Sequence, residues 1–262
     1  MSDPTESSAG IGTAEVSVHA SAAEVAEFAA GNLLETLRRA QLERDTADVV
    51  LTGGGVGTAT LRAVSEHPNR DSLDWSRLRV WWGDERFVAS DSTDRNDVGA
   101  AEALLDRVPL DRSQVFRMPA VNDMDGTDVD AAAARYAGWL ADAAPGLIRV
   151  PAFDVLLLGV GPDGHVASLF PGHPELSESD RMVVAVRDSP KPPPTRISLT
   201  YPAINSAREV WLLAAGAEKA DAVGAALSGS AEVSAIPAVG VRGTVRTRWL
   251  LDRAAARDLS AD

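Results

Sequence analysis

Apolar residues along the chain recur with two spacings, and the two spacings alternate. Short, almost continuous apolar runs are typical of strands buried on both faces of a sheet, whereas apolar residues three or four positions apart are typical of helices. The runs predict strands at residues 48–51, 78–82, 115–118, 153–159, 181–186, 196–199, 209–214 and 248–251. The helical spacing predicts a long helix behind the capping box of Ser21 and Glu24, and further helices at residues 59–66, 98–105, 129–143 and 218–227.

This alternation predicts an α/β fold with a largely parallel sheet flanked by helices. Residues 1–12 are rich in serine and glycine and lack periodicity, so they are expected to form a flexible N-terminal tail. Residues 13–262 contain neither an internal repeat nor a linker, so they are expected to form a single domain. Ligands of parallel sheets bind beyond the carboxyl ends of the strands, and this is where the functional residues are expected.

The composition narrows the class of partner. The 262 residues include 25 Lys and Arg against 38 Asp and Glu, a formal net charge of −13. An acidic surface repels nucleic acids and anionic membranes, so neither is expected as a partner, and an anionic substrate needs a locally basic pocket. There is no cysteine, which excludes disulfides and a thiol nucleophile. The N-terminus lacks the features of a secretory signal, so a soluble cytoplasmic protein is expected.

Three segments with unusual chemistry follow predicted strands. They are TGGGVGT at residues 52–58, GDERFVASDSTDRND at residues 83–97, and GVGPDGHVASLFPGHP at residues 159–174. The glycine run leaves backbone N–H groups free at a helix start, so Gly54 and Gly55 are candidate anion-binding residues. The other interpretation of this run is a tight structural turn. It is neither a P-loop nor a dinucleotide-binding loop, since Thr58 occupies the last glycine position of the latter.

Gly159, Gly161 and Gly164 also have the spacing of a dinucleotide-binding loop. However, Pro162 removes one of the N–H donors, and Pro171 interrupts the long helix that such a loop should open. We therefore expect no dinucleotide cofactor, and no other cofactor is indicated.

Asp163 and His165 are the first candidate catalytic pair. An imidazole can accept a proton from water near neutral pH, and a neighbouring carboxylate can orient the ring or stabilise its protonated form. The alternative is a loop histidine with only local hydrogen bonds. The glycine-bearing turns on both sides, which would let a substrate approach the backbone, favour the catalytic interpretation.

Polar residues after the second strand form a further candidate cluster. Asp84 and Arg86 directly follow the apolar run, and Asn96 closes the same segment. They could bind sugar hydroxyls, hold a catalytic water, or only form surface ion pairs. The required basic groups occur later in the chain, at Lys191 and Arg196 of a proline-rich segment and at Lys219 near a helix start.

Metal and serine-hydrolase chemistry have no sequence support. The four histidines, His19, His67, His165 and His173, lack helical ligand spacing, and no GxSxG segment is present. We therefore expect no bound metal.

Taken together, the segments resemble the 6-phosphogluconolactonase family. The matching stretches are TGGGVGTATLRAV, WWGDERFV with DRND, FDVLLLGVGPDGHVASLFPGHP, KPPPTRISLTYPAIN and GAEKADAV, in the family's order between about Val49 and Val223. The histidine-containing stretch is highly specific, whereas the glycine loop and GAEKA are shared with glucosamine-6-phosphate deaminases. The resemblance implies a Rossmann-like architecture. One departure stands out: the family's glycine loop usually reads SGGSTP, so hydroxyls are missing at Gly55 and Val56.

The resemblance implies hydrolysis of 6-phospho-D-glucono-1,5-lactone to 6-phospho-D-gluconate, in the oxidative pentose phosphate pathway, without metal or cofactor. It also implies functional coupling to glucose-6-phosphate dehydrogenase, which makes this lactone. The catalytic residues would be His165 as general base, Asp163 as its orienting group, and Asp84 and Arg86 at the sugar. The phosphate and substrate contacts would come from Gly54, Gly55, Arg196, Lys219, Lys191 and Asn96.

Two alternatives belong to other functional classes. The deaminase relatives have an acidic residue shortly after the histidine, as in GxDGHIAFNEP, and this chain has Ser168-Leu169-Phe170 instead. A non-catalytic sugar-phosphate-binding regulator would usually carry a DNA-binding segment, and the first fifty residues contain no basic recognition helix. Both alternatives therefore have less support than the lactonase interpretation.

Overall fold

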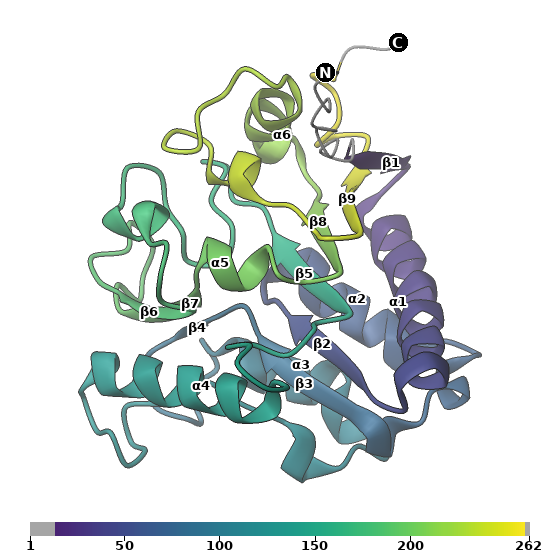
Figure 1. Cartoon of the computed structure of the whole chain (residues 1–262). Coiled ribbons are helices and arrows are strands. Elements are labelled where there is room, and N and C mark those ends of the chain that lie inside the picture. The colour runs from purple at the N-terminus through teal and green to yellow at the C-terminus, as the bar shows by residue number, and fades with distance from the viewer. Residues whose placement is uncertain (1–13, 260–262) are drawn as a thin grey trace, which may run out of the picture.

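The computed structural model describes residues 14–259, which Figure 1 shows as coloured ribbon. Within these residues, six strands form a parallel sheet in the order β1-β9-β8-β5-β2-β3. The strands are β1 (Glu15–His19), β2 (Ala47–Leu51), β3 (Leu78–Trp82), β5 (Val155–Gly159), β8 (Glu209–Ala214) and β9 (Arg246–Asp252). The predicted flexible tail, residues 1–12, lies outside the described residues.

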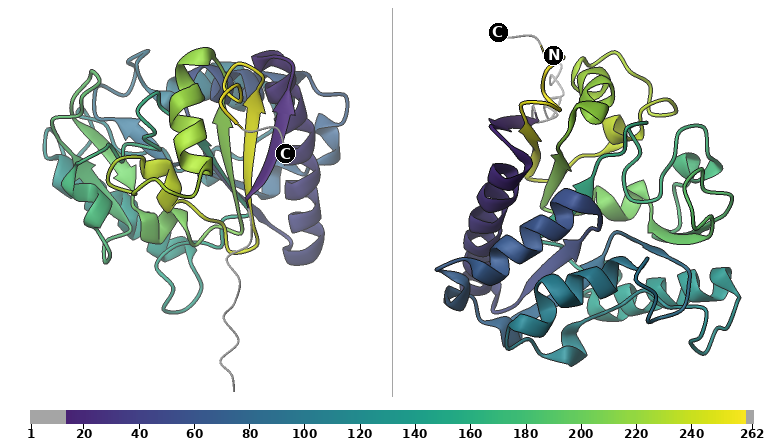
Figure 2. Two further views of the ribbon diagram at one scale, coloured as in Figure 1. Left: turned by 90° about the horizontal axis from the view of Figure 1, so that it is seen from above. Right: turned by 180° about the vertical axis from the view of Figure 1, so that it is seen from behind.

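Helices flank this sheet, as the sequence predicts. They are α1 (Ala22–Arg44), α2 (Gly54–Glu66), α3 (Asn96–Ala103), α4 (Val129–Ala143), α5 (Tyr201–Ile204) and α6 (Ala220–Leu227). Helices α1 and α2 pack against each other and against the sheet, and the view from behind in Figure 2 shows both across one face of it. The capping box forms at the start of α1, where Ser21 Oγ accepts the Glu24 N–H and the Glu24 carboxylate accepts the Ala20 N–H.

A second, smaller sheet is antiparallel. Its strands β4 (Asp84–Arg86), β7 (Arg196–Leu199) and β6 (Val183–Val186) are ordered β4-β7-β6, and α4 packs against β6 and β7. The sequence predicts the strands at β6 and β7 but treats residues 84–86 as part of a polar loop. Pairing with β7 makes these three residues a strand despite their charge, because the neighbouring strand supplies the hydrogen-bond partners.

Most of the hydrophobic core is one large cluster that contains residues from α1 to β9, and Phe170, Val184 and Val186 form a second, small cluster. Among its largest fully buried side chains are Trp81, Trp82, Trp211, Tyr136 and Phe153. Two indole groups still find acceptors inside the core: Trp81 Nε1 donates to Asp48 Oδ1 at 2.9 Å and Trp211 Nε1 to Glu209 Oε2 at 2.9 Å. Buried polar groups usually have such partners, but the buried Nε1 of Trp82 has none among the described residues.

The structure differs from the sequence-based prediction at three further places. Residues 115–118 form no strand: Val115 makes only an isolated bridge to Val80, and Pro119 cannot continue a ladder because it lacks an N–H. Strand β1 is not predicted, since its valines at positions 16 and 18 are exposed at the sheet edge and give a weak apolar signal. Helix α2 begins at Gly54 rather than at residue 59, because the glycines that lower the helical signal form its first turn.

The parallel arrangement places three polar segments at one edge of the sheet. Strands β2, β3 and β5 are adjacent and parallel, so the residues after Leu51, Trp82 and Gly159 leave the sheet on the same side. Gly83 N donates to Leu51 O at 3.1 Å, and Gly159 N donates to Thr52 Oγ1 at 3.3 Å. The glycine loop, the acidic segment and the histidine segment are therefore held together at their origins.

Candidate active site

A cleft of about 270 Å³ lies where these segments meet. Eight of the ten predicted site residues line it: His165, Asp84, Arg86, Asn96, Gly54, Lys191, Arg196 and Lys219. The other two are Asp163, whose carboxylate contacts Nδ1 of His165, and Gly55, which follows Gly54 in the first turn of α2. The structure thus brings together residues that are up to 165 positions apart in the chain.

The His165 ring is fixed by Asp163. His165 Nδ1 lies 2.5 Å from Asp163 Oδ1, and a tight turn closes around the pair, with Gly161 N donating to His165 O at 2.9 Å and Gly164 N to Gly161 O at 3.0 Å. The Phe170 ring packs beside the imidazole, 4.6 Å between centroids. Because Nδ1 is engaged by the carboxylate, Nε2 is the ring nitrogen that remains to exchange a proton.

The environment of Asp163 stabilises the ionised form of its carboxyl group. Burial alone would raise the pKa of its carboxyl, but the hydrogen bond and charge of His165 and the charge of Lys191 outweigh burial and hold that pKa well below its usual range. Asp163 therefore stays ionised whenever His165 could act as a base. An anion in this position stabilises a protonated imidazole.

Two lysines give the cleft its local positive charge. Lys191 Nζ lies 3.5 Å from His165 Nδ1 and 3.9 Å from Asp163 Oδ1. Burial and the nearby charge of Lys191 both lower the pKa of Lys219. Two ammonium groups close enough to repel each other form a site that a doubly charged anion would stabilise. This meets the expectation of a basic pocket on an acidic protein.

Arg196 is more buried than the sequence suggests, with 4% of its surface exposed. Its Nε donates to Pro193 O at 3.2 Å, and its Nη2 donates to Lys191 O at 3.0 Å and Pro192 O at 3.3 Å. Its Nη1 lies 3.9 Å from Asp84 Oδ2. Arg196 therefore shapes the proline-rich segment that carries Lys191, in addition to lining the cleft.

Asp84 is held by a serine that sequence reasoning missed. Ser168 Oγ donates to Asp84 Oδ2 at 2.7 Å, and Ser168 N donates to Ser198 Oγ of β7 at 3.1 Å. Ser168 is fully buried. A serine inside the apolar VASLF run is the only signal that could have indicated this role.

Arg86 and Asn96 form a wall of the cleft that borders the glycine loop at Gly53. Arg86 Nη1 donates to Asp94 O at 3.0 Å and to Asn96 Oδ1, while Asn96 Nδ2 donates to Asp84 O at 2.9 Å. Within the described residues, the buried Nε of Arg86 has no hydrogen-bond partner. A donor that is buried without a partner is costly unless a ligand accepts from it. Arg86 can therefore bind an oxygen atom in the cleft.

The glycine loop presents backbone N–H groups. Gly53 is the N-cap of α2 and provides no side-chain cap, and Gly54 has a φ of 80°, which favours glycine. A side chain at Gly53 would overlap Asn96, whereas the Cβ position at Gly55 is open. An uncapped helix start can bind an anion through its N–H groups, so the loop can act without the missing hydroxyls.

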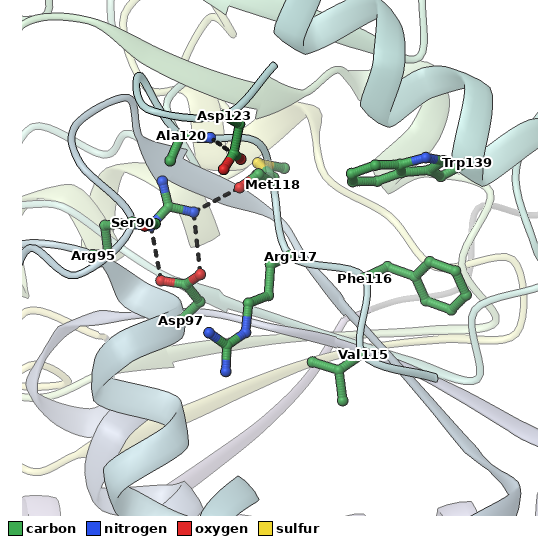
Figure 3. A pocket seen from close by; sticks show the side chains of 10 residues that line it. All are labelled: Ser90, Arg95, Asp97, Val115, Phe116, Arg117, Met118, Ala120, Asp123 and Trp139. Atoms are coloured by element: carbon green, nitrogen blue, oxygen red, sulfur yellow. Dashed lines mark hydrogen bonds and ion pairs between the residues drawn. The ribbon is translucent and has the colours of Figure 1, made fainter. Parts of the chain in front are cut away.

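A second hollow, of about 390 Å³, lies beside α3 and contains none of the predicted site residues. Figure 3 shows Arg95 and Asp97 paired on one side of it, and Phe116 and Trp139 on another. Among residues 14–259, no three His, Cys, Asp or Glu side chains form a group that could hold a metal ion. None of the described helices is both long and apolar enough to cross a membrane.

Comparison with known proteins identifies the family. Residues 20–249 match the family described as glucosamine-6-phosphate isomerases/6-phosphogluconolactonase. The chain is 55% identical to 6-phosphogluconolactonase of Streptomyces coelicolor over 94% of this chain and 95% of the relative, and 51% identical to that of Mycobacterium tuberculosis over 87% and 91%. The solved structure of 6-phosphogluconolactonase from Trypanosoma brucei superposes with a TM-score of 0.79, at 29% identity, over 94% of this chain and 99% of that one. The chain therefore belongs to the 6-phosphogluconolactonase family, a family of lactone hydrolases within the superfamily that also contains the glucosamine-6-phosphate isomerases.

Proposed function

We propose that this protein hydrolyses 6-phospho-D-glucono-1,5-lactone to 6-phospho-D-gluconate, with His165 as the general base. The observation that carries the proposal is the pair of His165 and Asp163 in a cleft lined by cationic side chains. The family's known members are lactonases by name, and the chain matches them over most of its length.

In the proposed mechanism, His165 Nε2 takes a proton from a water molecule as the water oxygen attacks the lactone carbonyl carbon. The carbonyl oxygen becomes an oxyanion in the tetrahedral intermediate. When the carbonyl re-forms, the bond from that carbon to the ring oxygen breaks, and the protonated imidazole returns its proton to the ring oxygen. Asp163 holds the ring and stabilises its positive form.

The cations of the cleft divide into two groups. Lys219 and Lys191, with the N–H groups of the glycine loop, form the more positive part and would hold the 6-phosphate. Asp84, Arg86 and Asn96 form a connected wall of the cleft and would bind the sugar ring. Arg196 contributes charge and supports the segment of Lys191.

The remaining sequence expectations belong to this proposal. We propose that residues 13–262 act as one domain, which the large core cluster with residues from α1 to β9 supports. The protein would work in the cytoplasm without a metal or cofactor. Its substrate would couple it functionally to glucose-6-phosphate dehydrogenase, because that dehydrogenase releases the lactone.

A direct assay tests the reaction. Freshly generated 6-phosphogluconolactone should disappear faster with the protein than in its absence, and a chelator should not reduce the acceleration. No acceleration by folded protein would contradict the lactonase assignment, and ammonia release from glucosamine 6-phosphate would then be measured. Loss of activity in chelator would contradict the metal-free mechanism alone.

Variants of Lys219 and Arg196 should separate an effect on phosphate binding from an effect on the stability of the proline-rich segment. Lys219→Ala should raise KM by about tenfold or more, because it removes a charged contact to the phosphate, and should leave the melting temperature nearly unchanged. Arg196→Ala should raise KM and also lower the melting temperature, since three backbone carbonyl groups lose their donor. Steady-state kinetics and thermal unfolding check both. An unaltered KM in Lys219→Ala would remove that residue from the phosphate site.

A further inference from the structure

Glu85 is a buried acidic residue between two side chains that line the cleft. Successive side chains of a strand point to opposite faces, so Glu85 of β4 points away from the face shared by Asp84 and Arg86. It is 1% exposed and does not line the cleft. A carboxylate with this burial needs partners, because an isolated buried charge is strongly unfavourable.

Its partners are backbone N–H groups on two elements. Glu85 Oε1 accepts the N–H of Arg86 at 2.8 Å and the N–H of Asn96 at 2.8 Å, and Oε2 accepts the N–H of Asp97 at 2.9 Å. Asn96 and Asp97 are the first two residues of α3, whose N-cap, Arg95, provides no side-chain cap. Glu85 therefore caps α3 from a different part of the chain, where a negative charge is also favoured by the helix dipole.

This cap joins the two residues that form one wall of the cleft. The same carboxylate oxygen binds the backbone of Arg86 and of Asn96, and the side chains of these two residues bind each other. Asn96 also reaches the backbone of Asp84 and lies against Gly53 of the glycine loop. A shift of α3 relative to β4 would separate Arg86 from Asn96 and open the wall.

A buried ion pair between Arg95 and Asp97 stabilises the junction, by which we mean the contact between the first turn of α3 and β4. Arg95 Nε donates to Asp97 Oδ1 at 2.9 Å, and Arg95 Nη2 donates to Met118 O at 2.6 Å, as Figure 3 shows. Arg95 Nη2 also lies 3.9 Å from Glu85 Oε2. Burial raises the pKa of Glu85 to about 7, although the charge of Arg95 and the N–H groups act in the opposite direction. The carboxylate is thus held at a cost, which is typical of a group with a functional reason for its position.

We infer that Glu85 is a positioning residue for substrate binding, because its carboxylate fixes the first turn of α3 against β4 and so holds Arg86 and Asn96 in the cleft. This rests on the proposed contact of Arg86 with substrate. Glu85 does not line the cleft, and it acts through Arg86 and Asn96.

The test is a double-mutant cycle with Glu85→Gln and Arg86→Ala. Glutamine keeps the shape of the side chain but places an NH₂ group against one of the N–H donors. Glu85→Gln should raise KM for the lactone about tenfold with a small change in kcat. Arg86→Ala should raise KM at least as much. In the double variant, the rise in KM should be clearly smaller than the product of the two single effects, since much of the effect of Glu85→Gln passes through Arg86.

Asp97→Asn is the matched control. It breaks the buried pair with Arg95 and leaves the three N–H groups on Glu85, so it should lower the melting temperature without raising KM. An equal rise of KM in Asp97→Asn would mean that any loosening of this junction has the same effect, and would overturn the inference. Additive effects in the double variant would overturn it as well.

The outcomes also separate this inference from the proposed function. If Arg86→Ala raises KM and Glu85→Gln does not, the inference fails and the substrate contact of Arg86 stands. If Arg86→Ala leaves KM unchanged, both the contact and the inference fail. Should Glu85→Gln not fold, Glu85→Asp keeps the charge but withdraws it from the N–H groups, and the same rise in KM is expected.

Discussion

Replacing His165 by alanine is expected to lower kcat for lactone hydrolysis on the order of 10²- to 10⁴-fold, the usual contribution of a general base. The ring is the proposed base, and among the described residues no other histidine lines the cleft, so no second imidazole can substitute. The side chain lies at the surface of the cleft, and its removal leaves the core cluster intact. The variant should therefore remain folded, which thermal unfolding would verify alongside steady-state kinetics.

His173→Gln is the matched control for this experiment. His173 belongs to the same loop and also packs against Phe170, with 5.6 Å between ring centroids, but it does not line the cleft. Its replacement should leave kcat unchanged. If His165→Ala kept nearly full turnover, or if both variants lost activity equally, His165 would have to be abandoned as the base.

The sequence predicts the site better than it predicts the elements around it. Asp163 and His165 are recognisable because they are polar residues after an apolar run, and parallel strands bring such residues to one edge. Lys191 and Arg196 are recognisable in a proline-rich segment, and Lys219 near a helix start. The family resemblance added the roles that spacing alone leaves open. The extra antiparallel sheet was partly missed because β4 consists of three charged residues whose strand form depends on pairing with β7.

The supporting contacts could not be predicted in the same way. Ser168 and Glu85 act through partners that are 84 and 11 or 12 positions away, and nothing in the local sequence specifies those partners. Arg196 was predicted as a phosphate ligand, yet most of its donors bind backbone carbonyl groups of its own loop. Tertiary contacts of this kind depend on how separate elements dock, which periodicity and motif spacing do not report.

The tight packing of His165 on Gly161 leads to the second large effect. A Cβ atom at Gly161 would overlap Nδ1 and Cε1 of His165 and Oδ1 of Asp163, although the backbone of Gly161 is not in the left-handed region. Gly161→Ala should therefore push the histidine and the aspartate away from their present positions while straining the backbone little. A displacement of about 1 Å at a reacting group can cost about 10²-fold, so kcat should fall by at least about 10²-fold.

Gly138→Ala provides the comparison for this change. Gly138 lies in α4, its Cβ position is open, and alanine there should raise the free energy of unfolding by roughly 0.5–1 kcal/mol without altering kcat. The two alanine variants thus separate the effect of an added methyl group from the effect of displacing the catalytic pair. Combining Gly161→Ala with His165→Ala should give no further loss beyond His165→Ala, because both remove the same base. If the combined variant lost kcat by the full additional factor of Gly161→Ala, the effect of Gly161 on kcat would not depend on the position of His165.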